Sequence, residues 1–146
     1  MDDVINREGA RVILVGPDGR VLLFQGGDPG DPEAGLWWMT PGGGVDPGES
    51  TQAAAARELR EETGFVVGEL GPIVHERTAD FRFMGKPYRQ HEVFYRVRLE
   101  QAPADLDRSG WTAVERDTLT DARWWSAAEL RSTAETIYPE SLADLI

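Results

Sequence analysis

The sequence predicts an α/β fold in which a β-sheet lies between helical layers, and three observations support this class. Continuous apolar runs near the N-terminus are typical of strands that are covered on both faces. An alanine-rich segment with capping residues at both ends predicts a central helix, and further strand patterns follow it. Helical patterns return near the C-terminus. In a chain of 146 residues, this order favours an α/β/α sandwich in a single domain, residues 1–146.

The first strands are expected at residues 11–15 and 20–24, where two apolar runs flank a Gly-Pro-Asp-Gly turn. A turn-rich loop follows at residues 26–35, and we expect it at the surface near a functional site. A short strand at residues 36–39 then leads into a glycine turn at residues 42–44.

The central helix is expected to begin with Ser50 or Thr51 as its N-cap and to end at Gly64. Its four consecutive alanines offer a smooth surface that can approach a sheet closely. Further strands are expected around residues 73–74 and between residues 81 and 99.

The last third of the chain carries weaker signals. Residues 100–123 are polar and irregular, so we expect no regular element there. Trp124 and Trp125 are expected in the core of a late strand. Helical patterns at residues 127–131 and 141–146 close the chain.

Acidic residues outnumber basic residues by 26 to 15, which makes the formal net charge −11. General binders of polymeric nucleic acid carry a basic face, so the composition argues against that class. A small phosphate-bearing substrate is compatible with this charge if a cation and local arginines reverse the field at the site. Lys86 is the one lysine among the basic residues. Arginine suits phosphate oxygens, and a coding bias toward arginine accounts for the count equally well.

The chain has no cysteine, which excludes disulfides, thiolate metal sites and cysteine nucleophiles. No apolar stretch approaches the roughly 20 residues of a membrane-spanning helix, and the N-terminus shows no signal-peptide pattern. We therefore expect a cytoplasmic protein without a membrane partner, present as a monomer or a homodimer.

Three glutamates, Glu58, Glu61 and Glu62, lie within five consecutive residues near the end of the predicted helix. Helical spacing places Glu58 near both others, and each like-charge neighbour costs roughly 0.2–0.5 kcal/mol. The negative end of the helix dipole adds roughly 0.3–1 kcal/mol for each exposed carboxylate. A hard divalent cation such as Mg²⁺ would resolve this repulsion. For these three residues alone, a solvated acidic helix face is the alternative.

The glutamates belong to a longer pattern of fixed residue types over residues 43–65, which reads Gly43-x5-Glu49-x7-Arg57-Glu58-Leu59-x-Glu61-Glu62-x-Gly64-Phe65. This pattern resembles the Nudix box of the Nudix hydrolase family, with Phe65 where an aliphatic residue is more usual. Residues 38–43 and 123–130 also resemble the family, so the likeness extends over most of the chain. It implies a Nudix-type α/β/α sandwich with a mixed β-sheet.

The resemblance also implies an activity. Nudix hydrolases cleave the diphosphate linkage of nucleoside diphosphate derivatives by water attack on phosphorus, with Mg²⁺ or Mn²⁺ as cofactor. The signatures of the subgroups that cleave ADP-ribose, diadenosine polyphosphates, NADH and coenzyme A do not occur in this chain. This leaves a MutT-like hydrolase of nucleoside triphosphates or of another small nucleotide conjugate. A non-catalytic, Nudix-like nucleotide-sensing module is the alternative, although sensors often have degenerate boxes and this box is intact.

The resemblance assigns expected roles to the acidic residues. Glu58 and Glu62 are the expected metal ligands, and Glu61 is expected as a further ligand or as the general base. Glu49 is expected to reach the cluster through water. Arg57 is expected to orient the glutamates rather than to bind the substrate.

Other residues complete the predicted site. Gly42 and Gly43 let the backbone approach the substrate closely, and by resemblance the carbonyl of Gly42 is a further metal ligand. Glu115 lies where related enzymes often bring an extra glutamate from a loop, with a plain surface acid as an equal alternative.

Substrate contacts are expected from aromatic residues and from arginine. Phe24 and Trp38, like the neighbouring Trp37, are candidates for stacking on a nucleobase, with core packing as the alternative for each. Arg96 is a candidate phosphate contact, together with three other arginines of the same region, Arg82, Arg89 and Arg98.

Overall fold

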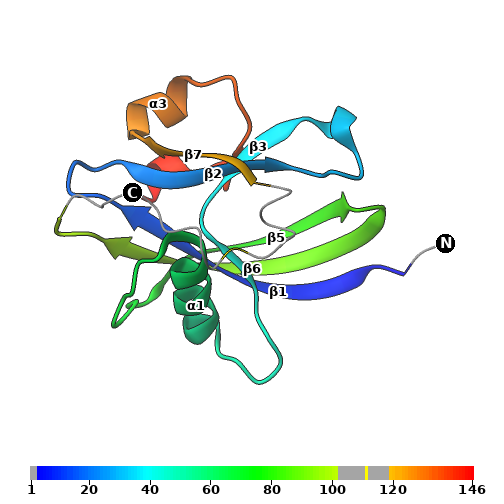
Figure 1. Ribbon diagram of the computed structural model, residues 1–146, viewed down its shortest axis with the longest axis horizontal. Helices are drawn as coiled ribbons and strands as arrows, with labels where there is room; N and C mark the ends of the chain where they lie inside the picture. Colours follow the sequence, from blue (N-terminus) through cyan, green and yellow to red (C-terminus); the bar gives the residue numbers. More distant parts are fainter. Residues whose placement is uncertain (1–2, 102–110, 112–118) are drawn as a thin grey trace.

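The computed structural model describes residues 3–101, 111 and 119–146, and a mixed sheet of eight strands forms the centre of this part (Figure 1). The strand order is β5-β6-β1-β2-β3-β8, with β4 paired to β1 and β7 paired to β2. β1 and β6 pair in parallel, as do β3 and β8, and the other pairs are antiparallel. The strands are β1 (Ile5–Val15), β2 (Val21–Gly27), β3 (Leu36–Met39), β4 (Gly42–Gly44), β5 (Ile73–Phe83), β6 (Lys86–Arg98), β7 (Leu119–Trp125) and β8 (Ile137–Tyr138).

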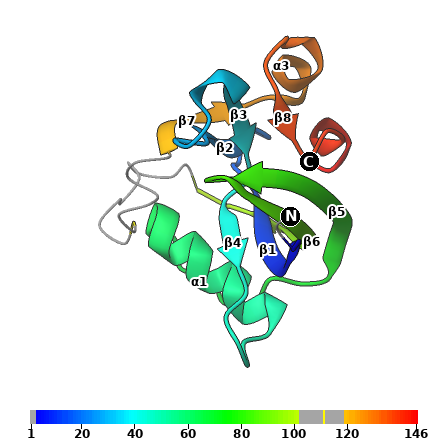
Figure 2. The ribbon, with the colours of Figure 1, turned by 90° about the vertical axis from the view of Figure 1, so that its right-hand side faces the viewer.

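Helices cover the sheet on two sides. Helix α1 (Thr51–Thr63) packs on β1 and β4, and helix α3 (Ala127–Ser132) lies on the other side of the molecule with the 3-10 turn η2 (Leu142–Asp144) (Figures 1 and 2). A second 3-10 turn, η1 (Pro32–Ala34), follows β2. The predicted α/β fold with a mixed sheet is therefore confirmed. No helix in the described part of the chain is long and apolar enough to span a membrane.

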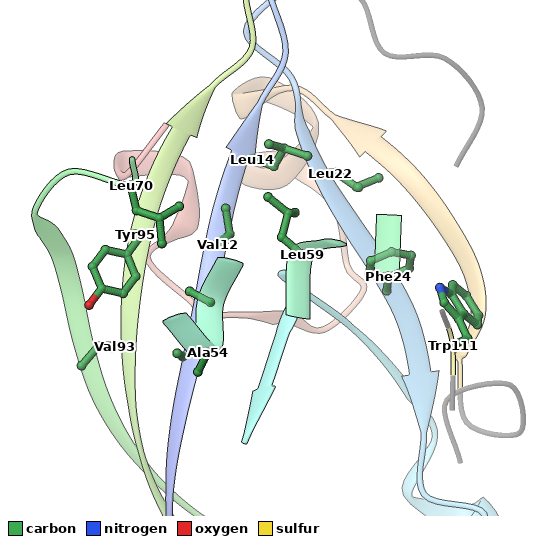
Figure 3. Packing of buried hydrophobic residues seen from close by; sticks show 12 residues of the cluster. Val12, Leu14, Leu22, Phe24, Ala54, Leu59, Leu70, Val93, Tyr95 and Trp111 are labelled. Atoms are coloured by element: carbon green, nitrogen blue, oxygen red, sulfur yellow. The ribbon is translucent and has the colours of Figure 1, made fainter. Parts of the chain in front are cut away.

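Strand β1 is apolar along its second half because both of its faces are covered. Val12 and Leu14 point toward α1, where they belong to a buried cluster with Leu59 (Figure 3). Ile13 and Val15 point to the opposite face and join a second cluster with Trp125, on the side of η2. All four β1 side chains are at most 1% exposed. This double burial explains the continuous apolar run, as predicted for strands inside a layered fold.

Helix α1 begins and ends where the sequence predicts. The Ser50 side-chain oxygen accepts a hydrogen bond from the backbone N–H of Ala53 at 3.1 Å, which satisfies a free donor of the first turn. Gly64 ends the helix with φ of 82°, a left-handed conformation that glycine adopts without strain. Thr63 is buried at the last helical position and its hydroxyl donates to the carbonyl of Leu59.

Two predictions about the N-terminal half were wrong. Strand β1 begins at Ile5, six residues before the predicted start, because its exposed first half pairs with Tyr88–His91 of β6 through backbone hydrogen bonds. The predicted glycine turn at residues 42–44 is strand β4, paired with β1 from Gly9 to Arg11. Both errors arise from strand pairing between distant segments, which leaves no apolar periodicity in the sequence.

Two predictions about the C-terminal part were also wrong. Residues 119–123, expected to be irregular, belong to β7, which pairs with β2 as far as Trp125. The helical pattern at residues 141–146 forms only the short turn η2, because Leu142 and its neighbours pack against the second cluster. Strand β8 was not expected at all, and its two residues pair with β3.

Candidate active site

A cleft of about 750 Å³ opens between the second half of α1 and the sheet. Two sets of residues line it. The acidic wall is made by β4 and α1 and consists of Gly42, Gly43, Arg57, Glu58, Glu61 and Glu62. The sheet wall is made by β1, β5 and β6 and consists of Arg7, Arg11, Arg77, Ala79, Phe81, Gln90 and Glu92. Figure 2 shows α1 and β5 on opposite sides of β4 and β1.

Glycines occupy the two positions where the acidic wall meets β4, and each leaves space that a side chain would fill. A Cβ on Gly42 would lie 2.4 Å from the carbonyl oxygen of Ala10, and its φ is +148°, so no other residue fits without strain. A Cβ on Gly43 would lie 2.7 Å from Oε1 of Glu58. The carboxylate of Glu58 therefore occupies the space that a side chain at position 43 would take.

Glu62 is the most buried carboxylate of the acidic wall, with 3% of its surface exposed. The backbone N–H of Gly42 donates to its two carboxylate oxygens at 3.3 and 3.4 Å. Its own backbone carbonyl accepts a hydrogen bond of 2.7 Å from Nε1 of Trp111. Glu62 is thus tied to β4 through its side chain and to Trp111 through its main chain.

Arg57 holds the acidic residues in place through hydrogen bonds from its guanidinium group. Its Nε and Nη2 donate to the two oxygens of Glu49 at 2.9 and 3.0 Å. Nη1 donates to Glu58 at 3.1 Å and to Glu61 at 3.2 Å, and Nη2 also donates to the carbonyl of Gly44. One guanidinium thereby connects the entry of the helix, β4 and the acidic wall.

These contacts move the pKa values of the paired groups. The hydrogen bonds from Arg57, and then the one from the backbone of Asp46, lower the pKa of Glu49 to about 2. The same pairing with Glu49 raises the pKa of Arg57 above its ordinary value. Both groups are therefore charged throughout the neutral range, and the Glu49–Arg57 pair is a constant part of the site.

The oxygen donors of the acidic wall fit a hard divalent cation in their chemistry, since carboxylates and a backbone carbonyl are the ligands that Mg²⁺ takes. Glu58, Glu61 and Glu62 all line the cleft. Within the described ranges, however, no three acidic or histidine side chains converge closely enough to enclose an ion. Binding of a cation requires these carboxylates to draw together, and Arg57 keeps two of them within reach of one nitrogen.

The sheet wall contains a buried carboxylate between two arginines. Glu92 is 4% exposed, and Nε of Arg11 donates to its Oε2 at 2.5 Å. Nη1 of Arg77 lies 3.9 Å from its Oε1. Nη1 of Arg11 also donates to the carbonyl of Thr40 at 2.9 Å, and the Arg77 guanidinium stacks over the ring of Tyr138. These contacts hold the guanidinium groups of Arg11 and Arg77 in place on the sheet wall.

Two loops meet at the rim of the cleft through Asp28, which is 6% exposed. Its carboxylate accepts from the backbone N–H of Met84 at 3.0 and 3.1 Å and from that of Gly30 at 2.8 Å. Met84 lies in the turn between β5 and β6 with φ of 54°, a conformation that is uncommon for a residue with a side chain. Asp28 therefore connects the loop after β2 to the β5–β6 hairpin. This agrees with the expectation that residues 26–35 lie near the site.

Most of the predicted site residues come together. Phe24 and the residues of the acidic wall line the cleft, although Phe24 is 1% exposed and packs edge-on against Trp111. Glu49 lies behind the wall, bound to Arg57. Glu115 lies outside the described residues.

Two predicted substrate contacts lie elsewhere. Trp38 is 3% exposed and packs edge-on against Trp125 in the second cluster, because alternation along β3 sends Trp37 to the cleft and Trp38 to the core. Arg96 donates from Nη1 to the carbonyl of Leu145 at 3.0 Å, which holds it against the C-terminal segment. In this structure neither side chain reaches the cleft.

Sequence reasoning missed the arginines and polar residues of the sheet wall. Arg7, Arg11 and Arg77 lie on strands that are remote from one another along the chain. The one available signal was the alternation of polar residues along β6, where Gln90 and Glu92 share a face. That signal did not show which other strands would pair with β6.

Comparisons with known proteins identify relatives of this chain. A family model described as the NUDIX domain matches residues 5–145 of the chain. The RNA pyrophosphohydrolase of Caulobacter vibrioides (strain NA1000 / CB15N) is 32% identical over 95% of this chain and 81% of its own length. The RNA pyrophosphohydrolase of Novosphingobium aromaticivorans is 46% identical over 75% of this chain and 78% of its own length.

Solved structures agree on the fold. A MutT protein from Methanosarcina mazei Go1 has a TM-score of 0.70 at 20% identity, over 99% of this chain and 95% of that chain. The dihydroneopterin triphosphate pyrophosphohydrolase of E. coli has a TM-score of 0.64 at 22% identity, over 99% and 97% of the two chains. At these identities the likeness concerns the fold alone.

Proposed function

The chain belongs to the Nudix hydrolase family, and we propose that its acidic wall hydrolyses the diphosphate linkage of a nucleotide with Mg²⁺ or Mn²⁺ as cofactor. Pyrophosphate hydrolysis of nucleotide derivatives is the activity of the family. The identity of the ion, the roles of single residues and the substrate are the parts that we propose here. A non-catalytic sensor is not favoured, since the box is intact and the relatives are pyrophosphohydrolases.

One observation carries the proposal: three carboxylates and two close-packed glycines face arginines across a single cleft. The whole chain has a net charge of −11. Within the described residues the cleft is also lined by more acidic residues than basic ones, but it brings together Arg7, Arg11, Arg57, Arg77 and Arg82. A bound divalent ion supplies charge neutralisation at the phosphate oxygens and lowers the pKa of a bound water. The arginines of the sheet wall add positive charge on the opposite side of a bound phosphate chain.

The positions of the residues in the acidic wall suggest a separate role for each of them. Glu58 and Glu62 would hold the ion together with the carbonyl of Gly42. Glu61 either adds a ligand or accepts the proton of the attacking water, and its side chain is the more exposed, at 32% against 13% for Glu58. Arg57 positions Glu58 and Glu61 through hydrogen bonds from one nitrogen, Nη1. Gly43 leaves room for the Glu58 carboxylate and a close phosphate.

The proposed substrate is a small nucleotide that carries a diphosphate or triphosphate. The cleft volume of about 750 Å³ lies in the range of pockets that bury one small ligand. The charge of −11 disfavours binding along a nucleic-acid strand. A second candidate is the 5′-triphosphate end of an RNA, because the relatives are named RNA pyrophosphohydrolases. In that case only the terminal nucleotide would enter the cleft. The expected cytoplasmic location and the oligomeric state stay predictions.

A substrate panel tests the proposal. Purified protein is incubated with nucleoside triphosphates, nucleoside diphosphate conjugates, dinucleoside polyphosphates and a short 5′-triphosphorylated RNA, each with Mg²⁺, with Mn²⁺ and with EDTA. We expect release of phosphate or pyrophosphate from at least one class with metal and none with EDTA. The pattern of substrates separates the two candidates.

Thermal unfolding adds a readout that does not need the right substrate. Preferential binding of the ion to the folded protein stabilises it by about 2.7 kcal/mol at 100 times the dissociation constant. We therefore expect Mg²⁺ or Mn²⁺ to raise the Tm by several degrees relative to EDTA. An unchanged Tm together with no hydrolysis in the panel would contradict the proposal.

A further inference from the structure

The side-chain amide of Gln90 lines the cleft, and among the described residues it has no hydrogen-bond partner. Gln90 is 4% exposed and lines the cleft. Its amide makes no hydrogen bond with any residue in the part of the chain that the structure describes. Buried polar groups in native proteins are nearly always paired, so an unpaired one that faces a cleft indicates a ligand or water partner.

Small neighbours leave this amide open. In the sheet, Gln90 lies between Ala79 of β5 and Arg7 of β1. A Cβ on Gly9 would lie 2.9 Å from Nε2 of Gln90, so the amide rests against a position that has no side chain. The guanidinium of Arg7 stacks over the ring of Tyr88, 5.4 Å from its centroid.

The other polar group of the same strand face is already paired. Glu92 lies two residues along β6 and is bound by Arg11 and approached by Arg77. Gln90 is therefore the neutral polar group on this face that is available to a ligand. Its amide offers one acceptor oxygen and two donor hydrogens.

An aromatic face lies beside the amide. Phe81 pairs with Tyr88 one side-chain row beyond the Ala79–Gln90 pair, and it lines the cleft. Its ring stacks on Tyr88 with centroids 5.5 Å apart and an interplanar angle of 20°, and 37% of its surface is exposed. A flat group that enters the cleft can stack here while its edge reaches Gln90. Nucleobases combine such a π-face with adjacent donors and acceptors.

We propose that Gln90 determines substrate specificity by hydrogen bonding to the edge of the nucleobase, with Phe81 as the stacking surface. This inference rests on the proposed function, since it takes the substrate to be a nucleotide whose phosphates face the acidic wall. A bidentate pair between glutamine and a base edge discriminates between bases by roughly ten- to a hundredfold in affinity.

The test compares Gln90→Leu with wild type, because leucine has a similar size and no hydrogen-bonding group. Binding of methylene-bridged, non-hydrolysable analogues of ATP, GTP, CTP and UTP is measured by calorimetry in the presence of Mg²⁺. Methylenediphosphonate serves as the base-free probe. We expect the dissociation constant of the best-bound nucleotide to rise about tenfold or more, and that of methylenediphosphonate to stay the same.

Two further variants serve as a control and as a replacement. Gln52→Leu on the exposed surface of α1 is the matched control and should bind every probe like wild type. If Gln90→Leu does not fold, as judged by circular dichroism, Gln90→Met replaces it and the same change is expected. With a hydrolysed nucleotide, the Gln90 variant should show a raised KM and a nearly unchanged kcat, which a purely structural role would not produce.

The outcomes separate this inference from the proposed function. Equal nucleotide binding by wild type and the Gln90 variants overturns the inference even if hydrolysis is normal. Selective loss of nucleotide binding supports it even if no substrate of the panel is hydrolysed, in which case the proposed function fails alone. Failure of wild type to bind any of the four nucleotides overturns the inference as well.

Discussion

The two walls of the cleft differ in how the chain builds them. The acidic wall comes from residues 42–62, one continuous segment that contains β4 and most of α1. The sheet wall comes from three strands and from residues as distant as Arg7 and Glu92. A continuous segment can carry a complete chemical motif, whereas the composition of the sheet wall depends on the register of β1, β5 and β6. The first wall is therefore suited to the common reaction, and the second to the choice of substrate.

The walls also differ in charge balance. The acidic wall holds three glutamates against one arginine, and Arg57 also binds Glu49 behind them. On the sheet wall, by contrast, two arginines flank the single carboxylate of Glu92. The acidic wall thus retains unbalanced negative charge, as the proposed cation site requires, while the sheet wall presents guanidinium groups to the cleft. Four variants test this division of labour.

The largest effect is expected from Glu62→Gln, which keeps the volume of the side chain and removes its charge. Glu62 is 3% exposed and bonded to β4, so the amide has little freedom to move away. If the acidic wall holds the ion, kcat should fall at least about 100-fold in steady-state assays. Glu69→Gln is the control, because Glu69 is exposed beyond the helix. Wild-type turnover by Glu62→Gln at saturating Mg²⁺ would remove Glu62 from the site.

A smaller effect is expected from Gly43→Ala, which displaces only the carboxylate of Glu58 on the acidic wall. The new Cβ would lie 2.7 Å from Oε1 of Glu58, and the flexible end of that side chain can move. We expect kcat to fall on the order of tenfold, with little change in the Tm. Gly68→Ala is the matched control, since a Cβ there meets nothing within 4 Å. A normal kcat would mean that the position of Glu58 is not critical.

A still smaller effect is expected on the substrate side from Asp28→Ala. The variant removes the acceptor for the N–H groups of Met84 and Gly30, so the β5–β6 hairpin should loosen. Hydrogen bonds to a charged group contribute about 1.5–3 kcal/mol when buried. We expect faster hydrogen exchange at Met84 and a KM raised about threefold, with kcat nearly unchanged. Glu33→Ala, at an exposed position of the same loop, should leave both quantities unaltered.

The smallest effect concerns stability in acid. The folded-state pKa of Glu49 is lowered from 4.5 to about 2 by Arg57. A depressed pKa stabilises the folded state fully above the unfolded-state value, and this contribution is lost as the pH falls from 4.5 toward 2. In EDTA, urea unfolding should therefore show a gap in unfolding free energy between wild type and Glu49→Gln that narrows over this range. A gap that stays constant from pH 6 to pH 2 would contradict the role of the Glu49–Arg57 pair.

The acidic wall was largely predictable from the sequence because its order is local. Helix α1 depends on hydrogen bonds between residues four apart, and its caps at Ser50 and Gly64 lie next to it. The spacing of Glu58, Glu61 and Glu62 then places these carboxylates on one side of the helix. To predict this part of the site, it was not necessary to know where a strand ends or which distant segment pairs with it.

The sheet wall was decided by the tertiary structure. The parallel pairing of β1 with β6 places Arg7 beside Gln90, and the pairing of β5 with β6 places Arg77 beside Glu92. Alternation along β3 turns Trp38 into the core, which was the alternative to base stacking, and the carbonyl of Leu145 holds Arg96 away from the cleft. Helical contacts are set by neighbours in sequence, whereas strand register is set by segments that the chain brings together only on folding. For that reason the sequence alone determined the chemistry of this protein, and only the folded sheet decided which side chains face its substrate.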